Sequence, residues 1–265
     1  RPPIAAIYAF ARTADDIADE GDATAPQRLA ELQAYGEDLA RAARGDGASA
    51  RWPQVFGPLA RMIAQFCLPE DLLADLLDAF RQDVAWTQAA RRYADAPELL
   101  DYCRRSANPV GRLLLHLAGV DDARARAQSD AICSALQLIN FWQDLSVDLP
   151  RGRFYLPLAD CAAHGLSPSD FQRFLPLGDA PPPPHARALI AREVQWARDL
   201  MRWPPPLTIS NSRVGAVASP GAWKCAFPPV STPPWPGAPS AGRLPPGARW
   251  VLPGSMAVRC RPRRW

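Results

Sequence analysis

Apolar residues recur at helical spacing through most of the first 202 residues, and this repeat constrains the fold more than any other feature. Between Ile4 and Ala18 they recur every three to four residues, which places them on one face of a helix. Similar segments cover residues 26–43, 52–66, 70–84, 96–117, 121–145, 167–174 and 185–202. No segment alternates apolar and polar residues as a strand would. The sequence therefore predicts an all-α fold.

Proline and glycine mark the expected breaks between these helices. Residues 45–47 and 151–157 read as loops, and residues 180–184 read as a proline-rich linker. Within the segment 96–117, residues 109–111 are expected to kink or break the helix.

The composition changes abruptly after Arg202. Residues 203–265 contain 14 prolines, five tryptophans and no Asp or Glu, and they show no helical periodicity. Disordered linkers are rich in proline but are rarely so rich in tryptophan. Residues 1–202 are therefore expected to form one domain, incomplete at both ends, and 203–265 a disordered or irregular tail translated out of frame. A natural proline-rich extension is the alternative, and the nucleotide sequence in the other frames decides between them.

The sequence argues against several other kinds of protein. No basic patch interleaved with aromatic residues appears in the first 200 residues, so nucleic-acid binding is not expected. None of the six cysteines forms a CxxC pair, which favours reduced thiols and a cytoplasmic location. No apolar run reaches the roughly 18 residues that a membrane span needs, and no signal peptide is visible.

A first acidic cluster ends the helix that begins at Ile4. Five acids fall within eight residues, and among them Asp15 and Asp19 are four apart and share one helix face. Like charges at that spacing repel unless a cation lies between them. The cluster is interpreted as one half of a metal site, with a solvated acidic helix end as the alternative.

A second polar line runs through the apolar segment 131–148. Its members follow one another at spacings of three, four and four residues, and they are Gln137, Asn140, Asp144 and Asp148. This spacing keeps all four near one face of a helix. Paired carboxylates suit Mg²⁺, which binds one or two of them together with substrate phosphates. A surface stripe on a packed helix is the alternative.

Nearby cations complete the expected site. Arg12 lies one turn before Asp16, and Arg151, Arg153 and Tyr155 follow Asp148 in a glycine-containing loop. Guanidinium groups bind phosphate in a bidentate manner. Two carboxylate pairs and these cations together predict a trinuclear Mg²⁺ site that grips a diphosphate.

Three segments resemble the squalene/phytoene synthase family. Residues 8–20 resemble its first aspartate-rich signature, residues 137–148 with 151–157 resemble the second, and residues 102–113 match its central helix. The resemblance covers about residues 1–200. It implies an isoprenoid synthase-type helical bundle around a central cavity, a prenyl diphosphate substrate and Mg²⁺. Within that site it implies Asp15, Asp19, Asn140, Asp144 and Asp148 as metal ligands.

Gln143 and the pair Asn108-Pro109 depart from many members and resemble the hopanoid-pathway subgroup. That resemblance implies hydroxysqualene synthase activity, in which presqualene diphosphate loses diphosphate and water captures the rearranged cation, with no NADPH. Tyr102 is then expected to offer a π face to the cation, and Asn108 to position the water. Pathway partner enzymes and loose association with the inner membrane surface are also implied.

Two other functions stay open at this point. Within the family, head-to-head condensation of two farnesyl diphosphates is the runner-up. From another class, the chain is the inactive product of a frameshifted gene, in which the losses at both ends remove packing. A proline-rich interaction module has little support, because the prolines of the tail lack a regular PxxP spacing.

Overall fold

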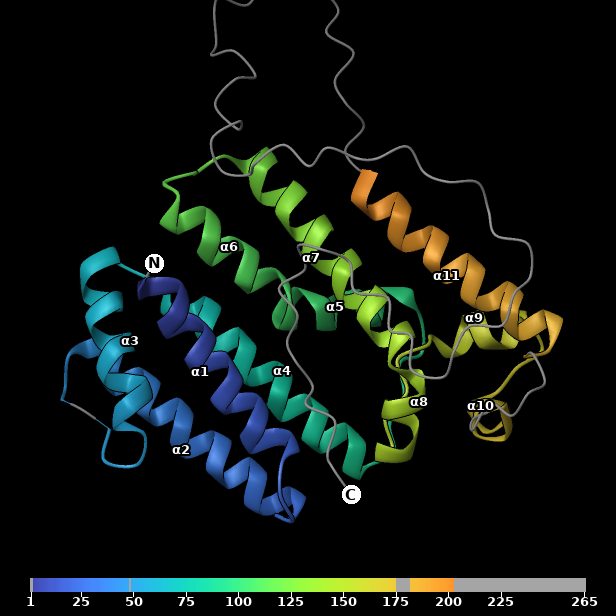
Figure 1. Ribbon diagram of the computed structural model, residues 1–265, viewed down its shortest axis with the longest axis horizontal. Coiled ribbons are helices and arrows are strands. Elements are labelled where there is room, and N and C mark those ends of the chain that lie inside the picture. Colours follow the sequence, from blue (N-terminus) through green and yellow to red (C-terminus); the bar gives the residue numbers. More distant parts are fainter. Residues whose placement is uncertain (1, 48, 175–181, 203–265) are drawn as a thin grey trace, which may run out of the picture. The chain divides into compact units, whose positions relative to one another are not determined.

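A computed structural model describes residues 2–47, 49–174 and 182–202, and within these ranges the chain is helical, without strands (Figure 1). The all-α prediction is confirmed. In chain order the helices are α1 (Pro2–Asp19), α2 (Ala25–Arg44), α3 (Pro53–Phe66), α4 (Glu70–Gln88), α5 (Ala96–Ser106), α6 (Asn108–Leu117), α7 (Ala123–Gln143), α8 (Leu145–Asp148), the 3-10 turn η1 (Leu149–Arg151), α9 (Leu158–Ala163), α10 (Pro168–Phe174) and α11 (Pro184–Arg202).

Helices α1 to α4 pack around a first hydrophobic core. At its centre the ring of Tyr35 lies 5.2 Å from Phe10 and 4.8 Å from Phe56, measured between centroids. Trp52 closes the group edge-on at 4.9 Å from Tyr35. The buried phenol of Tyr35 donates a hydrogen bond to the carbonyl of Phe10 at 3.0 Å, so the polar atom costs little inside the core. This core fixes α1, which carries the first acidic cluster.

A second hydrophobic core joins α5, α7 and α11 to the segment that follows α8. Helices α6, α7 and α11 run side by side, and α4 contacts helices of both cores (Figure 1). The buried members of this second core include Tyr102 of α5, Phe141 of α7 and Tyr155 of the loop after η1. Because α4 contacts α1 of the first core and α5 of the second, it joins the two cores.

The expected break in the segment 96–117 is present, one residue before Asn108. Helix α5 ends at Ser106 and α6 begins at Asn108, with Ala107 between them at φ −118° and ψ −44°. Proline lacks an N–H and its ring clashes with the carbonyl four residues earlier. Pro109 at the second position of α6 therefore stops α5 and starts a new helix.

The end of α7 differs from the sequence prediction, and one short helix was not predicted. Helix α7 ends at Gln143 instead of continuing to residue 145, and a separate short helix follows. Helix α9, within the region after the predicted loop 151–157, was not predicted, because six residues are too few to show a periodicity.

The predicted tail, residues 203–265, lies outside the described residues, so the change of reading frame stays a prediction. Over the ranges that the structure covers, no helix is both long enough and apolar enough to cross a membrane.

Candidate active site

The first acidic cluster occupies the last turns of α1. Arg12 pairs with Asp15 at 2.7 Å and with Asp16 at 2.5 Å, one turn along the same helix. The pKa of Asp15 is raised to about 6, mainly by burial and then by the neighbouring charge of Asp19, against the opposing charge of Arg12. A fully solvated helix end would not show this shift. The carboxylates of α1 therefore crowd a partly buried site that is short of positive charge.

Asp19 makes the contact that links the two acidic segments. Arg153 donates to both of its carboxylate oxygens, with Nη1–Oδ2 at 2.7 Å, and the two side chains are 15% and 17% exposed. Arg151 lies farther away, at 3.7 Å from Asp19, and is 50% exposed. Residues 134 apart in the sequence thus form a bidentate, largely buried ion pair.

Asp148, at the end of α8, belongs to the same electrostatic environment. The pKa of its carboxyl group is raised to about 7, mainly by burial and also by the charges of Asp144 and Asp19. Arg153 and Arg151 oppose it. The charges of the two acidic segments thus act on one another, with Arg153 and Arg151 near both.

The polar line on α7 is less buried than the sequence suggested. Asn140 and Asp144 are exposed and Gln137 is half-buried. The outer face of the helix also exposes Ile132 and Leu136, at 46% and 50%. Helix α7 packs against α5, α6 and α11 and leaves this outer face exposed, as the alternative of a surface stripe on a packed helix predicted.

The helical turn nevertheless continues across the end of α7. The N–H of Asp148 donates to the carbonyl of Asp144 at 2.9 Å, across the boundary with α8. The two carboxylates therefore keep the one-turn separation that their spacing predicted.

These donors fit Mg²⁺ as two carboxylate pairs. In the described part of the chain, no three His, Cys, Asp or Glu side chains converge closely enough to hold one metal ion by themselves. Mg²⁺ usually takes only one or two carboxylates and completes its shell with water and substrate phosphates. The raised pKa values of Asp15 and Asp148 mark carboxylates that a cation would relieve. An all-protein cage is not required for the site to hold the ion.

Asp83 of α4 was not predicted, and it lies at the centre of the polar network. Tyr102 donates its phenol proton to one carboxylate oxygen, and Tyr155 donates to the other at 3.2 Å. Burial raises the pKa of Asp83 to about 6, against the opposing charge of Arg153. The sequence did carry a signal, since Asp83 follows Phe80 by three residues and lies on the apolar stripe of its helix.

Aromatic rings surround this carboxylate. The rings of Phe141 and Tyr155 stack at 3.8 Å with an interplanar angle of 6°. Tyr102 and Tyr93 lie 6.0 and 5.8 Å from Tyr155. Trp142 points elsewhere and packs on Trp196 of α11, at 6.1 Å. Tyr102 thus lies in an aromatic cluster, and its role toward a cation stays a prediction.

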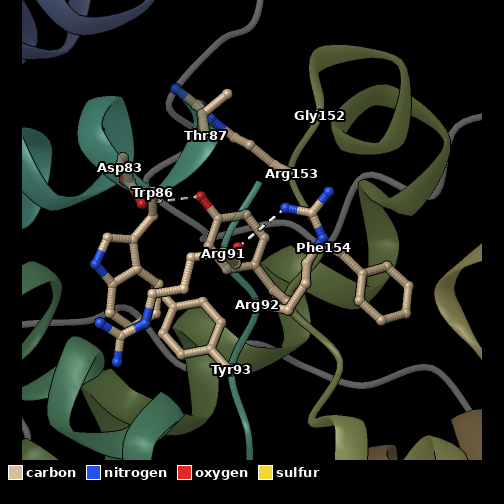
Figure 2. Close-up of a pocket in the computed structure, with 10 residues that line it drawn as sticks. Asp83, Trp86, Thr87, Arg91, Arg92, Tyr93, Gly152, Arg153 and Phe154 are labelled. Atoms are coloured by element: carbon tan, nitrogen blue, oxygen red, sulfur yellow. Dashed lines mark hydrogen bonds between the residues drawn. The ribbon is translucent and has the colours of Figure 1, made fainter. Parts of the chain in front are cut away.

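A small pocket opens beside the cluster, between the end of α4 and the loop that carries Arg153 (Figure 2). Asp83, Tyr155 and Arg153 line it. At its rim the guanidinium of Arg91 lies over the indole of Trp86, 4.0 Å from the ring centroid. The pocket therefore combines one carboxylate, several rings and cations in a single concave site.

Asn108 lies apart from these groups. It is buried at the start of α6, where its Oδ1 accepts a hydrogen bond from the hydroxyl of Ser134 at 2.9 Å. This contact joins α6 to α7. Its assignment as the residue that positions water stays a prediction, as does the assignment of Gln137 to substrate binding.

The chain matches known proteins over its helical part. The squalene/phytoene synthase family profile matches residues 1–203. The hydroxysqualene synthase of Zymomonas mobilis is 37% identical over 190 residues, which cover 68% of this chain and 59% of that protein. The presqualene diphosphate synthase of Rhodopseudomonas palustris is 34% identical over 151 residues, covering 57% of this chain and 51% of the relative.

A solved structure shares the fold. The crystal structure of squalene synthase HpnC from Alicyclobacillus acidocaldarius is 39% identical, with a TM-score of 0.63, and the match covers 74% of this chain and 68% of that one. The chain thus spans between half and about two thirds of the length of these relatives. The resemblance inferred from the two acidic segments and the central helix is confirmed: the chain belongs to the squalene/phytoene synthase family.

Proposed function

We propose that this chain is a Mg²⁺-dependent synthase that ionises a prenyl diphosphate and converts presqualene diphosphate to hydroxysqualene. The observation that carries the proposal is the junction of Asp19, Arg153 and Asp148, where the two acidic segments meet around one guanidinium. The similarity to a hydroxysqualene synthase supports this reaction within the family.

Asp15 and Asp19 from α1, with Asn140, Asp144 and Asp148 from the second segment, would hold the metal. Bound Mg²⁺ would supply Lewis-acid stabilisation of the departing diphosphate. Arg12, Arg151 and Arg153 would bind the phosphate oxygens, and Arg153 would exchange its contact with Asp19 for one with the diphosphate. The ion pair thus holds the site together until substrate arrives.

The aromatic cluster suits the second half of the reaction. Breaking the C–O bond leaves the electron pair on the diphosphate and a cation on the hydrocarbon. Rings of Tyr102, Phe141 and Tyr155 would attract that cation through their π faces. Rearrangement and addition of water then give hydroxysqualene and release one proton. Asn108 would orient the water, and no reductant enters this balance.

The alternative reaction is the condensation of two farnesyl diphosphates to presqualene diphosphate or squalene. The similarity to a presqualene diphosphate synthase favours it, because that relative is only slightly less similar. Both reactions begin with the loss of diphosphate, so the acidic segments and arginines would serve either. The two functions differ in the hydrocarbon part of the substrate that the site accepts.

The location and partners follow from the chemistry of the product. We propose a cytoplasmic protein that associates loosely with the membrane surface, since hydroxysqualene partitions into lipid. A sister enzyme that supplies presqualene diphosphate and another that reduces hydroxysqualene would complete the sequence.

Product analysis separates the two reactions. The chain is incubated with Mg²⁺ and either presqualene diphosphate or farnesyl diphosphate, without NADPH. Hydroxysqualene from the first substrate supports the proposal. Consumption of farnesyl diphosphate without formation of hydroxysqualene supports the alternative, and no release of diphosphate from either contradicts both. Asp22→Asn is the control for changes in the two carboxylate pairs, because this exposed acid lies outside both pairs.

A further inference from the structure

Asp83 makes hydrogen bonds to side chains beyond its own helix. It projects from α4 into the second core, where both of its oxygens accept phenol protons from two different segments of the chain. Tyr102 comes from α5, and Tyr155 comes from the loop after the second acidic segment. The carboxylate lines the pocket of Figure 2 together with Tyr155. One acceptor thus fixes the rotation of two hydroxyl groups beside the candidate site.

Packing alone does not require this carboxylate. Burying a charge among aromatic rings costs free energy unless hydrogen bonds compensate it. Phenylalanine at positions 102 and 155 would fill similar volumes without any partner. The rings already stack well, as Phe141 and Tyr155 do at 3.8 Å. Asp83 and the two phenols therefore form a unit with a cost that hydrophobic side chains would avoid.

The hydrogen bonds change what the phenols can do. A hydroxyl that donates to a carboxylate cannot donate to a substrate, so its ring and its oxygen lone pairs remain as the groups available to a cation. A charge-assisted bond also polarises the phenol and adds electron density to the ring. Both effects strengthen the attraction between the ring and a nearby cation.

We propose that Asp83 is a positioning residue that holds Tyr102 and Tyr155 as hydrogen-bond donors to itself, so that both rings meet the cation formed after diphosphate leaves. This inference rests on the proposed function, and it adds one residue to the set that the acidic segments define. Asp83 itself does not touch the diphosphate in this account, because it acts through the two tyrosines.

Tyrosine NMR tests the placement without any turnover. The chain has five tyrosines, so ¹³Cζ labelling gives few signals, which single Tyr→Phe variants assign. Asp83→Asn should shift the Tyr102 and Tyr155 signals and leave that of Tyr8 unchanged. Asp78→Asn on the same helix is the control and should shift neither of the two. If both signals keep their positions in folded Asp83→Asn, the inference is wrong.

A second comparison keeps the test valid if Asp83→Asn does not fold. Tyr102→Phe removes one of the two donors to Asp83, so the Tyr155 signal should shift. Tyr93→Phe is the matched control, because the Tyr93 ring also lies 5.8 Å from Tyr155 but its hydroxyl accepts a hydrogen bond from Gln82. Equal responses of the Tyr155 signal to the two variants would contradict a shared carboxylate.

Turnover then tests the role. Asp83→Asn and Tyr102→Phe should each lower kcat for presqualene diphosphate by roughly tenfold, with KM nearly unchanged. The double variant should be about as slow as the slower single variant, since both changes remove one interaction. Losses that multiply would show that Asp83 acts independently of Tyr102. If the wild-type chain releases no diphosphate, the proposed function fails, while the NMR comparison still decides the placement.

Discussion

The Asp19 carboxylate has two arginine neighbours that differ sharply in burial. Arg153 binds both oxygens and is 15% exposed, whereas Arg151 is 50% exposed at 3.7 Å. Removing one partner of a buried pair leaves an uncompensated charge, whereas an exposed pair contributes little. The two positions therefore make a matched test of how much the junction stabilises the chain.

Arg153→Ala should lower the free energy of unfolding by roughly 2–4 kcal/mol, and Arg151→Ala by less than about 1 kcal/mol. Urea denaturation followed by circular dichroism measures both. Equal losses in the two variants would mean that the bidentate contact with Asp19 does not join the two segments.

In contrast to Arg153, the acidic residues should matter for turnover and not for folding stability. Asp15→Ala and Asp144→Ala should each abolish turnover and leave folding stability nearly unchanged, since Asp144 is exposed and burial already opposes the charge of Asp15. Diphosphate release and thermal melts are measured on the same samples. Near-full turnover in either variant would overturn the metal-site assignment.

At the scale of elements, α6 and α7 pack closely at Gly111. A methyl group built there would lie 2.3 Å from the hydroxyl oxygen of Ser129 and 2.6 Å from the sulfur of Cys133. Gly111→Ala should therefore cost about 1–3 kcal/mol of stability. Adding Ser129→Ala and Cys133→Ala should restore most of the loss in a thermal melt. Without such recovery, the close approach of the two helices at this glycine would not be the cause.

The contact of α9 with α11 contains a buried acid. Glu193 is fully buried, and Arg192 donates to it at 2.8 Å while also pairing with Asp160 at 2.9 Å. The pKa of Glu193 is raised to about 7, mainly by burial and then by the charge of Asp160, against the opposing charge of Arg192. The folded chain favours the neutral form of Glu193. The contribution of Glu193 to folding stability is therefore fully present below pH 4.5 and is lost as the pH rises through 7, where the folded chain must bury the charged form.

Glu193→Gln should remove that pH dependence. The neutral amide should stabilise the chain at pH 8 by at most about 3 kcal/mol and have little effect at pH 5. Melting temperatures at the two pH values check this, with exposed Glu37→Gln as the control. A variant that is no more stable than the wild type at pH 8 would show that Glu193 is not held neutral.

The helices and acidic segments could be predicted because they depend on local spacing. Asp15 and Asp19 share a face by geometry alone, and Pro109 breaks its helix for reasons within a few residues of it. Exposure could not be predicted in the same way. Whether Asn140 and Asp144 are covered depends on which side of α7 meets its neighbours, and that is decided by helices distant in sequence.

The contacts that build the site could not be predicted from the spacing of residues along the sequence either. Nothing in the sequence pairs Asp19 with Arg153, which is 134 residues away, or chooses Arg153 over Arg151 as its partner. Asp83 was visible only as a carboxylate on an apolar stripe. The role proposed for Asp83 depends on hydrogen bonds from Tyr102 and Tyr155, which come from two other segments.

For the molecule as a whole, α4 joins two cores and carries Asp83 between the two acidic segments. Loss of either core would separate α1 from the end of α7. Circular dichroism therefore serves as a general check on the whole chain. A low helix content or the lack of a cooperative melt would contradict the folded arrangement on which every proposal depends.

Carboxylates of both acidic segments are proposed to grip one diphosphate through Mg²⁺. Calorimetric titration of inorganic diphosphate, with and without Mg²⁺, tests it on the wild-type chain and on Asp15→Asn and Asp148→Asn. Diphosphate should bind the wild-type chain only with Mg²⁺, and binding should be lost in both variants. Binding without the metal, or wild-type affinity in either variant, would contradict it.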